Sequence, residues 1–151
     1  MCYLVSTNTK SLNLEVDLGY YYTCLTTPSI LSPNKLRLRS KVQLTTEKPH
    51  ISQNTLYYQH DDTKAIVGES ATQHSIELDK TRNISYQILT YSIIAKSLNP
   101  KTPTNINLTI NYPLNIYNST TKQQFEQFLT TPDNINIFLN SKQYTFHIKQ
   151  T

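Results

Sequence analysis

Apolar and polar residues alternate from Leu12 to Leu18, and this pattern restricts the start of the chain to one kind of structure. Side chains of a β-strand point alternately to its two faces, so a period of two over seven residues indicates a strand with one buried face. Gly19 interrupts the alternation, and the aromatic, threonine-rich residues 20–27 are typical of a second strand. The sequence therefore predicts a β-hairpin over residues 12–27 that turns near Gly19 and Tyr20.

The next part of the chain is also predicted to be mainly extended. A third strand, bent near Ser40, is indicated by alternate apolar residues: Leu36, Leu38, Val42 and Leu44. Residues 47–62 are polar and end in His60-Asp61-Asp62, which predicts a loop around a short strand at residues 56–58.

Helical spacing begins after Asn83. Intervals of three and four place several apolar residues on one face of a four-turn helix: Ile84, Ile88, Tyr91, Ile94 and Leu98. Asn99-Pro100 ends this helix, because the residue before a proline disfavours the helical conformation. Alternation returns at residues 106–110 and predicts another strand.

The last part of the chain predicts a second helix and a hairpin. Thr120 and Thr121 each precede a glutamine by three residues, which is typical of a helix start, and this helix is expected to bury Phe125, Phe128 and Leu129. Residues 135–148 alternate around a turn at residues 140–142. The order of elements predicts an α/β fold with a mixed sheet and two main helices, in a single domain over residues 1–151.

The composition excludes several classes of protein. Only two glycines are present, Gly19 and Gly68, so the chain has no glycine-rich phosphate loop of the GxGxxG or GxxxxGK type. Two cysteines, Cys2 and Cys24, are too few for a disulfide framework or a zinc site. No apolar stretch approaches the roughly 18 residues of a membrane-spanning helix. We therefore expect a soluble, cytoplasmic protein that does not bind membranes.

The net charge is +4, and the lysines and arginines are scattered along the chain apart from one alternating set. Four cations alternate along the chain and would share one face of a strand: Lys35, Arg37, Arg39 and Lys41. Such a stripe can hold nucleic-acid phosphates. It is also typical of a solvated edge strand, which we prefer because no RNA-binding aromatic signature or recognition helix accompanies it. Direct contact with nucleic acid is therefore not expected.

The turn after Asp17 has the chemistry of a phosphate site. A strand that delivers an aspartate beside a tight glycine turn offers backbone N–H groups to phosphate oxygens. The Asp17 carboxylate can hold a hydrated magnesium ion, since Mg²⁺ prefers oxygen ligands and keeps several waters. Thr23, four residues after Gly19, is either a phosphate contact or an ordinary strand residue.

The segment from Val16 to Thr23 resembles the first phosphate hairpin of the actin-like ATPases, in which an apolar strand runs into Asp-x-Gly. More of the chain is similar, in the same order, to the N-terminal domain of the plasmid-segregation actins of the ParM/StbA type. The segments that carry this resemblance are Pro28-Ser29, Val67-Gly68-Glu69-Ser70-Ala71, Arg82 with the helix after it, the strand and loop at residues 106–117, the helix from Thr121 and the hairpin at residues 135–148.

The resemblance implies an actin-like, ribonuclease H-like fold and half of an ATP-binding cleft. It implies ATP and Mg²⁺ as cofactors, with Asp17, Gly19, Tyr20 and Thr23 as cofactor-binding residues and Asp17 as the metal ligand. It also implies self-assembly into filaments and a DNA-bound adaptor protein as partner. No residue of this chain is assigned a catalytic role.

Several residues depart from the family's pattern. Tyr21 stands where the second glycine of the phosphate hairpin is usual, Cys24 where a lysine is usual, and Asn111 where a glycine is usual. The chain stops at Thr151, before the segments that would complete the cleft, so we expect it to bind ATP weakly and not to hydrolyse it. Whether it is an enzyme is left open. The alternatives are a degenerate, non-hydrolysing assembly module and a small basic nucleic-acid-binding domain.

Overall fold

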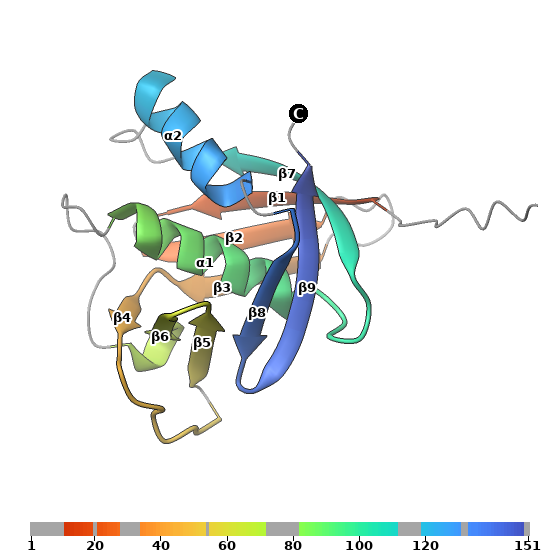
Figure 1. Ribbon diagram of the computed structural model, residues 1–151. Coiled ribbons are helices and arrows are strands. Elements are labelled where there is room, and N and C mark those ends of the chain that lie inside the picture. The colour runs from red at the N-terminus through yellow and green to blue at the C-terminus, as the bar shows by residue number, and fades with distance from the viewer. Residues whose placement is uncertain are drawn as a thin grey trace, which may run out of the picture.

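The computed structural model describes residues 11–19, 21–27, 34–53, 55–71, 82–111, 119–130 and 133–149, and shows one mixed sheet with two α-helices (Figure 1). The elements are β1 (Ser11–Leu18), β2 (Tyr22–Thr27), β3 (Asn34–Arg39), β4 (Val42–Leu44), β5 (Leu56–His60), β6 (Thr63–Val67), the 3-10 turn η1 (Gly68–Ser70), α1 (Arg82–Lys96), β7 (Thr104–Asn111), α2 (Ser119–Thr130), β8 (Ile135–Leu139) and β9 (Lys142–Lys149). The predicted fold class is confirmed.

The nine strands described here follow the order β3-β2-β1-β7-β9-β8-β5-β6-β4. The predicted N-terminal hairpin is confirmed, since β1 and β2 pair antiparallel around Gly19. On its other side β1 pairs parallel with β7, and β7 pairs parallel with β9. The carboxyl ends of β1 and β7 therefore meet at the same edge, where Asp17 lies opposite Asn111.

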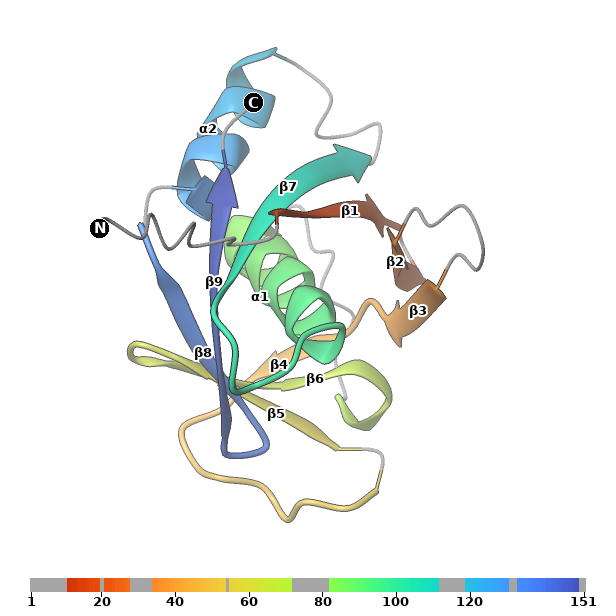
Figure 2. The same ribbon diagram turned by 90° about the vertical axis from the view of Figure 1, so that its right-hand side faces the viewer.

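The third strand differs from its prediction. Residues 34–44 form two strands, β3 and β4, which lie at opposite ends of the strand order although only Ser40 and Lys41 separate them. The backbone N–H of Ser40 still donates to the carbonyl of Tyr21, the residue before β2, whereas Val42 pairs with Val67 of β6. The two ends of the sheet are thus brought together, and the sheet curls around α1 (Figure 2).

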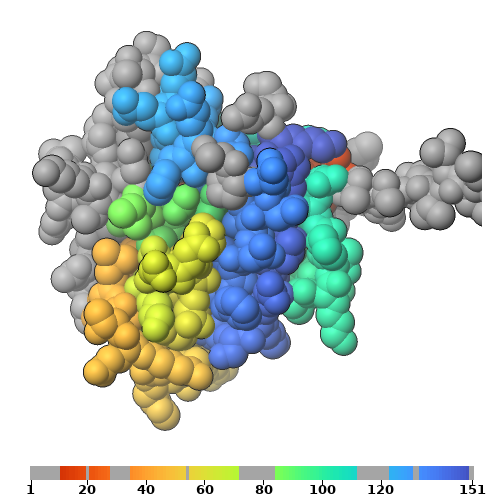
Figure 3. Space-filling view, in the orientation of Figure 1, coloured from red at the N-terminus to blue at the C-terminus, as the bar shows by residue number. Residues whose placement is uncertain are grey.

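This curl explains why α1 is buried on every side and not only on the predicted apolar face. Residues 85–95 are all buried, because β1–β4, β6, β8 and α2 surround the helix. Figure 3 shows β5, β6, β8 and β9 covering one side of it. Two of its buried polar side chains bond to α2: the Tyr91 hydroxyl donates to the Leu129 carbonyl (2.6 Å) and the Gln87 amide to the Phe128 carbonyl (3.2 Å). Burial raises the pKa of the Tyr91 hydroxyl.

The remaining elements confirm some predictions and correct others. The short strand predicted at residues 56–58 is confirmed as β5, which is two residues longer and forms a hairpin with β6 around Asp61, a residue with positive φ (51°). Helix α2 begins at Ser119, before Thr121, and buries Phe125 and Leu129 as predicted. Phe128 is 38% exposed, because the helix turns that side away from α1 and β9. No helix among the described residues is long and apolar enough to cross a membrane.

Candidate functional site

Asp17 lies at the carboxyl end of β1 with its side chain exposed. The exposed residues of β1 alternate with buried ones, so Asp17 shares the outer face of the sheet with Glu15, while Val16 and Leu18 face α1. Its cross-strand neighbours are Cys24 of β2 and Asn111 of β7. The carboxylate is therefore placed at the open edge of two parallel strands, where a ligand can approach it.

Gly19 fixes the turn between β1 and β2. Its backbone N–H donates to the Tyr22 carbonyl at 3.0 Å. An added Cβ would lie only 2.5 Å from that same carbonyl oxygen, so no other residue fits without opening the turn. Because this N–H is used inside the hairpin, Gly19 serves the site through shape and not as a phosphate donor. Tyr20, the next predicted cofactor-binding residue, lies outside the described residues.

Thr23 is fully buried, and its hydroxyl supports the turn from inside. Ser40 Oγ donates to the Gly19 carbonyl oxygen (2.7 Å) and lies 3.0 Å from Thr23 Oγ1. Since the single Ser40 proton goes to Gly19, Thr23 is the donor to Ser40. Of the two roles considered for Thr23, this arrangement is that of a buried strand residue, and its contact with a phosphate stays a prediction.

Ser40 is the residue of this site that the sequence did not reveal. It is buried and joins the two glycine motifs: its own N–H donates to the Tyr21 carbonyl (2.8 Å), while the neighbouring Lys41 carbonyl accepts from the Gly68 N–H (2.9 Å). The sequence did contain one signal for Ser40: it is a serine on the apolar face of the alternating segment, between Leu38 and Val42.

The second motif also depends on its glycine. Gly68 has a φ of +86°, in the left-handed region that glycine adopts most readily, and a Cβ there would lie 2.9 Å from Leu38 Cδ1. Glu69 follows in the 3-10 turn with an exposed side chain. The segment Gly68–Ser70 thus packs behind β3, on the same Ser40–Lys41 link that supports the Gly19 turn.

The oxygen atoms around Asp17 can coordinate a magnesium ion only if a bound ligand supplies the remaining oxygen ligands. No group of three metal-ligating His, Cys, Asp or Glu side chains occurs within the described ranges. Asn111 Nδ2 donates to Glu15 Oε1 at 3.1 Å, which ties β7 to β1 beside Asp17. Protein sites for Mg²⁺ commonly use one or two carboxylates with phosphates and waters completing the shell. Asp17 suits that role.

Comparison with known proteins identifies relatives of this fold. The family described as "Actin like proteins N terminal domain" matches residues 16–151. No curated protein sequence matches the chain. Among solved structures, the AlfA filament from the B. subtilis plasmid pLS32 is similar with a TM-score of 0.71 at 12% identity, over 91% of this chain and 54% of that protein.

Two further structures are similar at low identity. ParM from Bacillus thuringiensis, solved with AMPPNP, has a TM-score of 0.58 at 12% identity, over 93% of this chain and 44% of that protein. The archaeal actin homologue Ta0583, in complex with ADP, has a TM-score of 0.61 at 14% identity, over 91% and 41%. The chain thus spans about half the length of these proteins or less. Its sequence match and its fold agree, and the chain belongs to the family of actin-like protein N-terminal domains.

Proposed function

We propose that this chain forms the phosphate-binding half of a ParM-type, filament-forming ATPase. The observation that carries the proposal is the exposed Asp17 carboxylate at the carboxyl end of β1, beside a turn that only glycine can make. Relatives of the same fold were solved with AMPPNP and with ADP, which supports a nucleotide as the ligand.

Each residue of the proposed site has a different role. Bound MgATP would supply the divalent charge and the phosphate chain, and the Asp17 carboxylate would hold the ion. Gly19 lets the hairpin approach the phosphates closely, while Ser40 and Thr23 hold the turn rigid through their hydroxyl groups. Tyr20 completes the proposed cofactor-binding set with Asp17, Gly19 and Thr23.

The biological role proposed with this site is plasmid partition in the cytoplasm. The AlfA relative is a plasmid protein solved as a filament, which supports self-assembly as the mode of action. A DNA-bound adaptor protein is the proposed partner at the filament end. Hydrolysis is proposed for the complete two-sided cleft, because an actin-type nucleotide lies between two halves.

Calorimetric titration of the 151-residue chain with MgATP tests the nucleotide site. We expect weak, magnesium-dependent binding and no release of phosphate. Asp17→Asn keeps the shape of the side chain and removes its charge, so the magnesium-dependent part of the affinity is expected to disappear. Asp62→Asn, an exposed aspartate in the β5–β6 turn, is the matched control and is expected to bind like the parent chain.

Two results would contradict this proposal. Unchanged magnesium dependence in Asp17→Asn would remove the assignment of the phosphate hairpin. Phosphate release at the rate of a two-domain actin would show that this chain does not need a second half.

A non-hydrolysing assembly module is the second candidate function. It is favoured by Tyr21, which is 59% exposed at the turn where the family usually has a small residue, and by Cys24 in place of the usual lysine. This candidate predicts polymers that sediment equally with and without MgATP, whereas the proposed function predicts sedimentation that depends on the nucleotide.

A further inference from the structure

A row of cations lies on β3, the strand at one end of the sheet order. We name Lys35, Arg37 and Arg39 the β3 strip. These residues alternate along the strand, so their side chains share the outer face of the sheet. Lys35 and Arg37 are exposed and Arg39 is half-buried. The sequence predicted an edge strand here, and β3 has one strand neighbour, β2, in the described sheet. Lys41, the fourth cation of the predicted stripe, lies outside β3.

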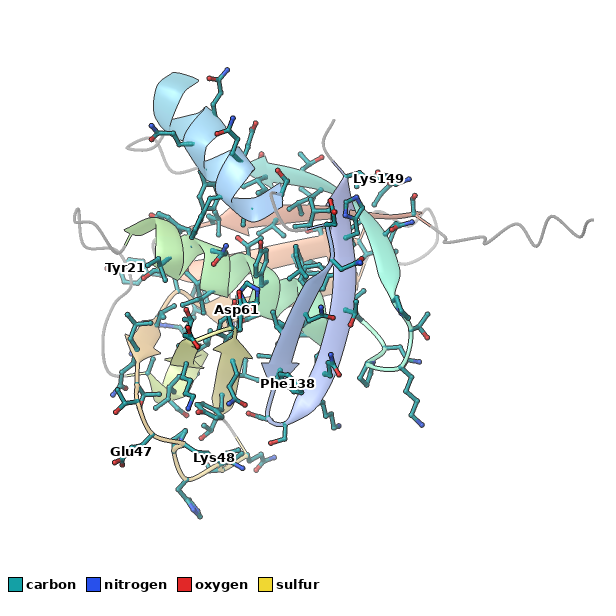
Figure 4. All side chains as sticks on the ribbon, viewed as in Figure 1. Tyr21, Glu47, Lys48, Asp61, Phe138 and Lys149 are labelled. Carbon is teal, nitrogen blue, oxygen red and sulfur yellow. The ribbon has the colours of Figure 1, made fainter. Side chains whose placement is uncertain are left out.

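Two aromatic rings, those of Tyr21 and Tyr22, lie next to these cations although they are distant from them in the sequence. The Arg37 guanidinium lies 4.2 Å from the centre of the Tyr22 ring, and that of Arg39 lies 5.2 Å from the same ring. Arg39 also lies 5.9 Å from the centre of the Tyr21 ring, which is 59% exposed. Tyr21 lies at the periphery of the molecule (Figure 4). The cationic strip therefore has an aromatic flank, the feature whose absence in the sequence argued against nucleic acid.

The charges on the outer face favour an extended anion at the edge. Through β2, the register places Lys35 level with Glu15 and Arg37 level with Asp17. Two strand spacings separate the cations from the carboxylates, roughly 9.5 Å. This distance is comparable with the Debye length of about 8–10 Å at ordinary salt. A polyanion is thus attracted to β3 and repelled from β1, which aligns it along the edge strand.

We propose that the β3 strip, with Tyr21, binds single-stranded nucleic acid. Alternate residues of a strand are roughly 6.6 Å apart, which lets neighbouring cations contact successive phosphates of an extended strand. An exposed tyrosine ring provides a stacking surface that accepts any base. The combination of a cationic track and a stacking ring is the usual means of binding single strands without sequence preference.

An acidic peptide added as a further strand is the competing occupant. Charged side chains on an edge strand usually prevent such pairing. An acidic peptide also has no base to place on the Tyr21 ring. The nucleic-acid strand uses both the charges and the ring, and this site does not depend on the nucleotide site at Asp17.

Fluorescence anisotropy with a labelled oligothymidine, measured over a range of salt concentrations, tests the proposal. Lys35→Gln/Arg37→Gln removes two exposed cations and is expected to weaken binding about tenfold or more at low salt. The slope of log K against log salt is expected to become shallower by about 1.4, because each lost phosphate contact contributes about 0.7 for single strands. Lys101→Gln/Lys142→Gln removes the same charge from other exposed positions and is expected to change neither quantity appreciably.

Further variants separate stacking from charge. Tyr21→Ala is expected to weaken binding about fivefold or more with an unchanged salt slope, and Glu15→Gln to strengthen it by removing a repulsive carboxylate. Circular dichroism confirms that each variant is folded. The proposal is overturned if the parent chain does not bind the oligonucleotide at low salt, if the control pair weakens binding equally, or if poly-glutamate competes as well as the oligonucleotide.

Discussion

The two glycines of this chain occupy two different turns, and each turn excludes a side chain for a different reason. At Gly19 the obstacle is backbone, because an added Cβ would lie 2.5 Å from the Tyr22 carbonyl oxygen. At Gly68 the obstacles are its own φ of +86° and the end of one flexible side chain, Leu38. A backbone obstacle cannot move without breaking the hairpin, whereas a leucine can change its rotamer.

The two turns nevertheless belong to one structure. Ser40 donates to the Gly19 carbonyl, and the carbonyl of the next residue, Lys41, accepts from the Gly68 N–H. The short link between β3 and β4 therefore fixes both motifs at once. The proposed phosphate hairpin is therefore held by its own backbone geometry and by the hydroxyl groups of Ser40 and Thr23.

The largest loss of stability is expected from Gly19→Ala. The new methyl group forces the hairpin apart and costs the hydrogen bond between Gly19 and Tyr22, which together destabilise the chain by about 3 kcal/mol. Urea unfolding followed by circular dichroism measures the change. Thr109→Ala, an exposed strand position on β7, is the control and is expected to shift stability by less than about 0.5 kcal/mol. A cost below about 1 kcal/mol for Gly19→Ala would show that the turn is not rigid.

Ser40→Ala is expected to have the next largest effect, about 2 kcal/mol, because it leaves the Gly19 carbonyl and the buried Thr23 hydroxyl without this partner. The same unfolding experiment measures it. Ser40→Ala/Thr23→Val removes both hydroxyls and is expected to cost less than the sum of the single changes, since no orphaned hydroxyl remains. Strict additivity would contradict the proposed network.

The sequence predicted those parts of the fold that depend on local pattern. Alternation located β1, and the break at Gly19 located its turn, because both are properties of neighbouring residues. The separation of β3 from β4 was not predictable in this way. It depends on Val42 pairing with Val67, which lies 25 positions further along the chain. For the same reason, the burial of the polar residues of α1 could not be predicted, since it results from the sheet that curls around the helix.

The candidate site, like the fold, could be predicted from the sequence only where it depends on neighbouring residues. Asp17 and Gly19 were identified because they lie two residues apart and their chemistry follows from residue type. Ser40 was missed because its partners come from another hairpin, and Tyr21 was not associated with Arg39 because only strand pairing brings them together. Long-range register therefore decided which residues support the site, and no periodicity in the sequence encodes that register.

Gly68→Ala is expected to cost about 1–2 kcal/mol, less than Gly19→Ala, because the penalty for a left-handed alanine is of that size and Leu38 can move away. A double-mutant cycle with Leu38→Ala separates the two causes. If the backbone angle dominates, the cost of Gly68→Ala stays within about 0.5 kcal/mol of its value in the parent chain. If the cost vanishes once Leu38 is shortened, packing and not φ requires the glycine. A cost above that of Gly19→Ala would reverse the order of the two turns, and the more rigid turn would then be the one at Gly68 rather than the proposed phosphate hairpin at Gly19.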